Sequence, residues 1–287
     1  MNWLYLSFLS IIFRALFSIA LKIQSNQANV SPITHSVLLT SLGALFALII
    51  SPLIGGIFLN EILDVWLITL IMIISQVIGN ILYFKGLERL DAGTTQIALS
   101  SILIWNTALS VIFLNSNFSI KQIIGIIFLM FAILIVQYSK GRNKLTSHIV
   151  YIILSAVAFA IFQVTTALLA NTMSTATYLF LSYFGAMILT IVLYYKKVAT
   201  DIQTIKNNSL IIGRNAVFVS GTSITFLLFL YYAFQSAPDK GVVAVLQTSQ
   251  VVLTVIFGII FLKEYGGMKR KLLAGIIALI AGILIKS

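Results

Sequence analysis

One arginine in this sequence is placed where it could bind an anion inside a membrane. Arg14 stands in the middle of a long apolar run, Trp3 to Lys22. A guanidinium holds carboxylates and phosphates with two parallel hydrogen bonds. Burying it near the centre of a membrane helix costs roughly 2.5–3.5 kcal/mol, so it should face protein or a wet cavity. The sequence therefore favours Arg14 as a ligand for an anionic substrate; the alternative is a structural role, bonded to helix carbonyls or neighbouring amides.

Amide and aromatic side chains accompany Arg14 in other apolar runs. Gln76, Asn80 and Tyr83 are spaced by four and three residues, which places them on one face of a helix. Amides are expensive against lipid, so they face inward, either in interhelical hydrogen bonds or around a polar cavity. For the whole set, a cavity is the better account. The predicted substrate-binding residues are Arg14, Gln76, Asn80, Tyr83, Gln96, Trp105, Asn106, Gln163, Tyr231, Gln247 and Gln250.

The composition requires a membrane protein. Of 287 residues, 60% are hydrophobic and 9% are charged, with a mean hydropathy of +1.08, whereas soluble domains carry about 25% charged residues. In a soluble chain the formal charge of +11 would suggest nucleic-acid binding. In a membrane chain basic residues collect in cytoplasmic loops, so no nucleic-acid partner is expected. The absence of cysteine excludes disulfides and thiolate metal sites, and no cofactor is expected.

Apolar runs long enough to cross a bilayer, about 20 residues each, predict an all-α integral membrane protein with ten transmembrane helices. The runs do not alternate as the strands of a β-barrel would. The predicted segments are Trp3 to Lys22, Thr34 to Phe58, Trp66 to Phe84, Thr94 to Leu114, Ile120 to Tyr138, Ile149 to Ala170, Thr175 to Tyr195, Leu210 to Phe234, Val242 to Leu262 and Lys271 to Ile285.

The sequence also repeats itself at an offset of 148 residues. Asp91 falls on Asp239 and Tyr83 on Tyr231. Each copy holds five predicted spans, an odd number, so the second copy enters the membrane in the opposite orientation. Inverted repeats of this kind place a substrate site near the midplane, and rocking of one half against the other gives alternating access. The predicted repeats are residues 1–144 and 145–287.

Two repeats of five helices resemble the drug/metabolite transporter superfamily, EamA-type members. The resemblance is clearest where Phe261-Leu262-Lys263-Glu264 is followed by Gly275. In that family an acidic residue closes the fourth helix of each repeat and a glycine opens the fifth, as Glu264, Gly275 and Gly125 do here. The departures from the family pattern are Ser116, Leu103 and Val251. The resemblance implies a ten-helix fold and the transport of small metabolites.

The basic residues predict an orientation. Thirteen Lys and Arg lie in alternate connections on one side of the predicted spans, and three lie on the other side. The positive-inside rule places the thirteen in the cytoplasm and both termini outside. Members of the resembled family are often drawn with cytoplasmic termini, so the two inferences conflict, and the count from this sequence is preferred.

All seven acidic residues lie in or beside connections, so no carboxylate is available at mid-membrane for a proton relay. His35 and His148 stand at predicted helix starts and are expected to be solvated or interfacial. These features favour a facilitative exporter or exchanger over a proton antiporter. The predicted function is secondary transport of a small polar metabolite, such as an amino acid, across the cell membrane. Its partners would be this small molecule and the lipid bilayer, and the chain would act as a monomer or homodimer.

Other functions fit the sequence less well. An intramembrane enzyme would need a nucleophile with its base, or a metal triad, inside the spans, and the sequence has no Cys and only two distant His. A receptor or channel would not need an inverted repeat. A flippase for a lipid-linked intermediate remains an alternative within the same superfamily.

Overall fold

The computed structural model describes residues 2–25, 30–87, 90, 95, 98–99, 101–137, 147–207, 209–262, 269, 273, 276–277, 280–281 and 283–285. These residues form helices and connections, and none of them lies in a strand. The helices are α1 (Trp3–Ser25), α2 (Pro32–Ile50), α3 (Trp66–Leu87), α5 (Ile102–Phe113), α6 (Ile120–Gln137), α7 (Ser147–Leu169), α8 (Thr175–Asn207), α9 (Ser209–Ser236), α10 (Lys240–Leu246) and α11 (Gln250–Leu262). Short 3-10 turns are η1 (Ser51–Leu53), η2 (Leu59–Ile62) and η3 (Gln247–Ser249).

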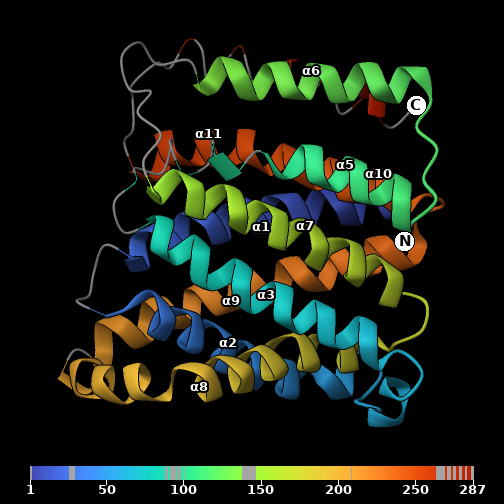
Figure 1. Ribbon diagram of the computed structural model, residues 1–287. Coiled ribbons are helices and arrows are strands. Elements are labelled where there is room, and N and C mark those ends of the chain that lie inside the picture. The colour runs from blue at the N-terminus through green and yellow to red at the C-terminus, as the bar shows by residue number, and fades with distance from the viewer. Residues whose placement is uncertain are drawn as a thin grey trace.

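The long helices lie side by side along one direction (Figure 1). The most extensive pairings are α3 with α7, α1 with α9, and α2 with α8. A further contact joins α1 to α11, while α6 lies at one edge of the bundle (Figure 1). Each of the three main pairs therefore combines a helix from the first half of the chain with one from the second half.

Within the described part of the chain, seven helical stretches are long and apolar enough to cross a membrane. They are Trp3–Gln24, Pro32–Leu53, Trp66–Leu87, Ser147–Leu169, Thr175–Ile202, Ile212–Ser236 and Lys240–Phe261, and two shorter apolar helices are Ile102–Phe113 and Ile120–Ala132. A multi-pass all-helical membrane protein is thus confirmed. The predicted count of ten stays a prediction, because parts of the segments Thr94 to Leu114 and Lys271 to Ile285 lie outside the described residues.

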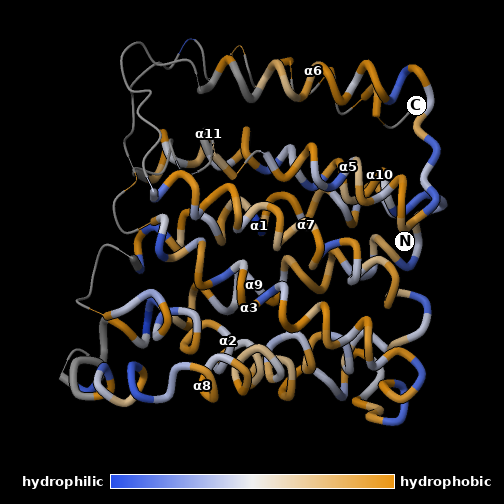
Figure 2. The backbone as a smooth tube through the Cα atoms, viewed as in Figure 1, coloured by the Kyte–Doolittle hydropathy of each residue, from blue (hydrophilic) through white to orange (hydrophobic). Residues whose placement is uncertain are grey.

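Apolar side chains cover the outside of the bundle as well as its interior. Figure 2 shows hydrophobic residues along the length of the helices and hydrophilic residues mainly at their ends. Ile112 and Val192 are 65% and 66% exposed. Such large exposed apolar surfaces would promote aggregation in water, and they are the surface that a membrane-spanning bundle presents to lipid.

Three predicted segments differ from the observed helices: one ends earlier, one continues further and one is interrupted. The second run was predicted to reach Phe58, but α2 ends at Ile50 and Pro52 lies in the following η1 turn. In α8 the backbone departs from helical geometry at Tyr194 (φ −130°, ψ 27°), where the predicted span ends, and a helical arm continues to Asn207. The ninth run breaks at η3, between α10 and α11.

The break at η3 has a counterpart in the first repeat. Ser249 Oγ donates to the carbonyl of Leu246 at 2.8 Å, and Ser101 Oγ donates to that of Ala98 at 2.9 Å. The two bonds join residues that are related by the sequence offset of 148. Ser101 directly precedes α5 and Ser249 directly precedes α11, so the same local bond stands before the fourth apolar helix of each half.

The arm of α8 is attached to the start of α2. Asp201 accepts hydrogen bonds from the backbone N of Ser31 at 3.0 Å and from Thr34 Oγ1 at 2.7 Å. Lys197, one turn earlier, lies 3.9 Å from the Asp201 carboxylate. Because the first N–H groups of a helix have no partner within it, this carboxylate stabilises the N-terminus of α2.

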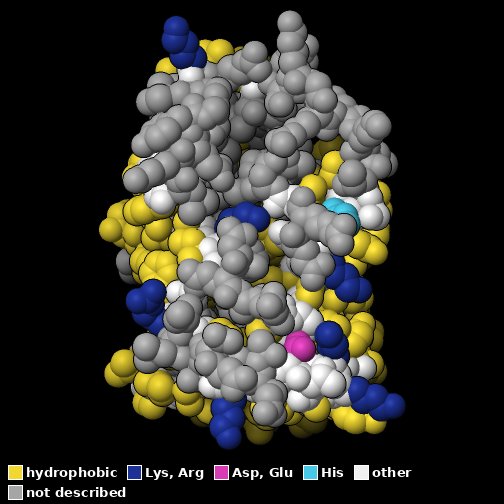
Figure 3. Space-filling model, turned by 90° about the vertical axis from the view of Figure 1, so that its left-hand side faces the viewer, with side chains coloured by type: hydrophobic (Ala, Val, Ile, Leu, Met, Phe, Trp, Pro, Cys, Tyr) yellow, Lys and Arg dark blue, Asp and Glu magenta, His cyan; other side chains and the backbone are white. Residues whose placement is uncertain are grey.

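Basic side chains collect at one end of the bundle, where α1 and α3 end and α2, α7 and α9 begin. We call it the basic end, and Figure 3 shows Lys and Arg spread over it with little visible carboxylate. Its described charged residues include Lys22, Lys85, Lys196, Lys197, Asp201, Lys206, Arg214 and Lys269. By the positive-inside rule this end is predicted to be cytoplasmic.

Close packing of α3 on α7 depends on a glycine. Ser155 Oγ of α7 donates to the carbonyl of Gly79 at 2.9 Å. A Cβ atom added at Gly79 would stand 2.7 Å from Cε1 of Phe159. A side chain at this position therefore requires the two helices or the phenyl ring to move apart.

We expect Gly79→Ala to lower the stability of the purified protein by about 1–3 kcal/mol, the usual cost of overpacking. The matched control is Gly213→Ala in α9, where an added Cβ would meet nothing within 4 Å. There the better helix propensity of alanine should leave stability equal or higher. Thermal unfolding in detergent measures both variants, and equal midpoints would contradict this packing argument.

Candidate functional site

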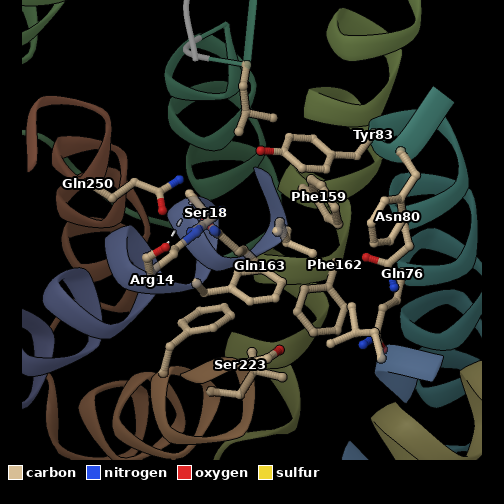
Figure 4. A pocket seen from close by; sticks show the side chains of 17 residues that line it. Arg14, Ser18, Gln76, Asn80, Tyr83, Phe159, Phe162, Gln163, Ser223 and Gln250 are labelled. Carbon is tan, nitrogen blue, oxygen red and sulfur yellow. Dashed lines mark hydrogen bonds between the residues drawn. The ribbon is translucent and has the colours of Figure 1, made fainter. Parts of the chain in front are cut away.

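A cavity with both polar and apolar lining residues lies in the centre of the bundle, between α1, α2, α3, α7, α9 and α11 (Figure 4). Its volume is about 60 Å³, whereas one water needs roughly 10–15 Å³ measured in this way. The cavity therefore holds a few waters or a small polar group as it stands. The predicted site residues that line it are Arg14, Gln76, Asn80, Tyr83, Gln163 and Gln250.

The cavity extends from the middle of the bundle toward the basic end. Leu21 lies near the end of α1, Leu39 lies in the first half of α2 and Phe84 lies near the end of α3, and all three line the cavity. The opposite half of the bundle is filled by large side chains. Tyr178 and Tyr231 are fully buried there and stack with ring centroids 4.1 Å apart.

Arg14 is the charged group in the cavity wall. Its side chain comes from the middle of α1 and is only 7% exposed. The guanidinium carbon lies 5.4 Å from the ring centroid of Phe226, a favourable cation–π position. None of the described lining residues is acidic. The positive charge is therefore held by neutral groups alone, and an anion entering the cavity would gain its full attraction.

Gln163 of α7 connects Arg14 to a buried amide behind it. Asn106 Nδ2 lies 2.7 Å from Gln163 Oε1 and 3.1 Å from the carbonyl oxygen of Ala244. With the Gln163 amide turned so that its oxygen faces Arg14, that oxygen lies 3.0 Å from Nη2. One amide oxygen cannot face both donors, and the bond to the charged group is the stronger one. This part of the site therefore has more hydrogen-bond donors than acceptors.

Three further amides at the cavity have atoms without a partner. Gln76 Oε1, Asn80 Nδ2 and Gln250 Oε1 are buried and have no hydrogen-bond partner among the described residues. Buried polar atoms are nearly always hydrogen-bonded. Figure 4 shows these side chains around the central space. They offer one donor and two acceptors to a molecule inside it.

The remaining wall is largely aromatic. Tyr83 and Phe159 meet edge to face, with centroids 6.1 Å apart. Aromatic faces suit an apolar group or a cation in the ligand. The aromatic lining residues are Phe17, Tyr83, Phe84, Phe159, Phe162 and Phe226.

The other predicted site residues lie away from the described lining. Gln247 is buried in η3 and bonded to α1, where Ser10 Oγ donates to its Oε1 at 3.2 Å. Trp105 is 40% exposed, and Gln96 lies outside the described residues. The Tyr231 hydroxyl lies 2.7 Å from the carbonyl oxygen of Met173 and 2.9 Å from that of Leu169. The part of these residues in substrate binding stays a prediction.

Sequence reasoning did not single out Ser18, Ser223 or the phenylalanines of the wall. Ser18 follows Arg14 by one helical turn, a spacing that could have indicated it. Ser223 carries no such signal; its Oγ lies 2.7 Å from the Tyr183 hydroxyl. A phenylalanine in an apolar helix looks the same whether it faces a cavity, a neighbouring helix or lipid.

The position of His35 differs from the sequence expectation of a solvated or interfacial residue. Its side chain is 4% exposed and stacks on Phe84, with ring centroids 5.6 Å apart. Neither ring nitrogen has a hydrogen-bond partner among the described residues. His35 is therefore buried one layer behind the cavity wall, because Phe84 lines the cavity.

Comparison with known families agrees with a chain built of two similar halves. The EamA-like transporter family matches residues 1–138 and again residues 146–287. The chain belongs to this family. It is accordingly a multi-pass membrane protein of the drug/metabolite transporter superfamily, and the two matches correspond to its two EamA-type repeats.

Solved structures support the fold of this EamA-type chain. One crystal structure superposes with a TM-score of 0.71 at 13% sequence identity, covering 98% of this chain and 96% of the other. At that identity the likeness concerns the fold alone. A search of the curated proteins finds no match.

The geometry of Tyr231 leads to a test that separates packing from substrate binding. We expect Tyr231→Phe to lower the thermal midpoint, because the buried carbonyl groups of Leu169 and Met173 lose their hydrogen bond to the hydroxyl. The loss should reduce the free energy of unfolding by about 1–3 kcal/mol. Ligand affinity at the central cavity should stay close to wild type. A large loss of affinity with an unchanged midpoint would instead place Tyr231 in the binding site.

Proposed function

We propose that this EamA-type protein is a secondary transporter of the cell membrane that exports or exchanges a small polar metabolite with an anionic group. A carboxylate of an amino acid is the simplest such group. The observation that carries the proposal is Arg14, buried in the wall of the central cavity without an acidic residue among the described lining. A carboxylate suits it because the guanidinium can donate two parallel hydrogen bonds to one.

The rest of the cavity supports a ligand that also has donors. Gln76 Oε1 and Gln250 Oε1 are open acceptors, and Asn80 Nδ2 is an open donor. An α-amino group can donate to one of these amide oxygens and lie against the aromatic faces. A lipophilic cation fits less well, because Arg14 would repel it.

Closure of the cavity on one side supports alternating access. At the end opposite the basic end, Glu61 Oε2 accepts from the backbone N of Ser174 at 2.8 Å, and Phe58 N donates to Thr177 Oγ1 at 2.8 Å. These bonds join the α2–α3 connection to the start of α8. Together with the Tyr178–Tyr231 stack they close this half, while the cavity continues toward the basic end. The arrangement is that expected of one state in a transport cycle.

The role of Arg14 can be tested by binding and by transport. In Arg14→Gln we expect the affinity for carboxylate ligands to fall by roughly 10- to 100-fold, the value of one charge-assisted hydrogen-bonded contact. Arg14→Lys should retain part of the affinity, because it keeps the charge and loses the planar fork. Binding is measured by thermal-shift titration with amino acids, and transport by uptake into proteoliposomes.

The control for this series is Lys121→Gln, which removes one positive charge from an exposed position on α6. It should bind and transport as wild type does. Unchanged carboxylate affinity in a folded Arg14→Gln protein would remove Arg14 from the substrate site.

Transport should not depend strongly on a pH gradient, since the described cavity lining contains no carboxylate or histidine to carry a proton. We expect imposed gradients of either sign to change uptake into proteoliposomes only slightly. Strong acceleration would contradict facilitated transport or exchange. If His35→Gln then abolished the acceleration, the proton would be assigned to the buried imidazole behind Phe84.

A further inference from the structure

A second hollow lies on the outer surface of the bundle, between α1 and α9 and near the basic end. It is a groove of about 310 Å³, which we call the α1–α9 groove. Its lining residues are Ala20, Ile23, Arg214, Asn215 and Phe218. Unlike the central cavity, it borders exposed side chains, since Arg214 is exposed and Phe218 is 55% exposed.

Arg214 occupies an unusual place for a charged residue. It is the third residue of the apolar stretch Ile212–Ser236, only about 3 Å inside that stretch at 1.5 Å per residue. Within the described part of the chain it has no ion pair or hydrogen bond, and the ion pair found there joins Lys197 to Asp201. An arginine at this depth on a lipid-facing surface extends its guanidinium toward the headgroups.

The order of residues along the groove matches the order of parts in a phospholipid. Arg214 and Phe218 are four residues apart and share one face of α9. Arg214 lies near the start of α9, where the apolar stretch begins, and Phe218 lies one turn further into that stretch. Ala20 and Ile23 give the α1 side of the groove an apolar wall.

The charge of the groove selects among phospholipids. Its described lining includes one cation and no carboxylate. Lys22, next to the groove in sequence, donates to the carbonyl of Leu90 at 3.0 Å. A zwitterionic choline headgroup would place its ammonium near Arg214 without an acidic partner, whereas a phosphatidylglycerol headgroup has a phosphate and no cationic group. The basic end is predicted to be cytoplasmic, and anionic lipids of that leaflet attract basic residues at the membrane surface.

We propose that the α1–α9 groove is a binding site for an anionic phospholipid of the cytoplasmic leaflet. Arg214 binds the phosphate, and Phe218 and Ile23 contact the upper part of an acyl chain. The site is separate from the central cavity and needs no substrate to be occupied.

The test uses the full chain purified in detergent and native mass spectrometry of bound lipid. Phosphatidylglycerol and phosphatidylcholine with the same acyl chains are the probes. Wild type should retain phosphatidylglycerol in preference to phosphatidylcholine, and Arg214→Gln should bind it about fivefold more weakly, the value of one basic residue at a membrane surface. Arg214→Lys should lose less, because the charge remains.

Lys121→Gln is the matched control, since it removes the same charge from α6 outside the groove and should bind lipid as wild type does. Equal retention of phosphatidylglycerol by wild type and a folded Arg214→Gln protein would overturn the proposal. So would retention without preference for the anionic lipid, or displacement of the lipid by millimolar inorganic phosphate. Carboxylate binding at Arg14 is measured separately by thermal shift, so the lipid proposal and the substrate proposal can each be contradicted without affecting the other.

Discussion

The desolvation cost of burying the Arg14 guanidinium in an apolar bundle determines which groups surround it at the centre of the protein. Arg14 cannot be solvated by lipid and has no carboxylate among the described lining residues. It is held by an aromatic face and an amide oxygen, from α9 and α7. Those helices must therefore approach α1 closely at one level of the membrane. The amides of α3 and α11 complete a polar layer at that level, between apolar layers.

This constraint also links stability to function. A buried cation paired only with neutral groups is less well satisfied than one paired with an acid. Because the described lining gives Arg14 no negatively charged partner, an anionic ligand can fill that role. Apolar packing away from the polar layer, such as the stack of Tyr178 on Tyr231, stabilises the fold without a ligand.

The sequence predicted most of the fold and part of the site. Apolar run length predicted the long helices of the described chain, and the offset of 148 predicted a chain of two repeats, because both patterns can be recognised without knowing which residues are in contact. Helix spacing placed Gln76, Asn80 and Tyr83 on one face, and all three line the cavity. It could not separate Tyr83 from its repeat partner Tyr231, which packs against a helix end instead. The burial of His35 was missed for the same reason, because the spacing of residues within one helix does not show which residues of other helices pack against them.

The pairing of helices limits what can move. Because α1 lies on α9, α2 on α8 and α3 on α7, the two sequence repeats are interlocked rather than standing as separate lobes. The Asp201 carboxylate further fastens α8 to the start of α2. If the two halves rock against each other as the sequence repeat predicts, the packed faces of these three helix pairs must slide over one another during the motion.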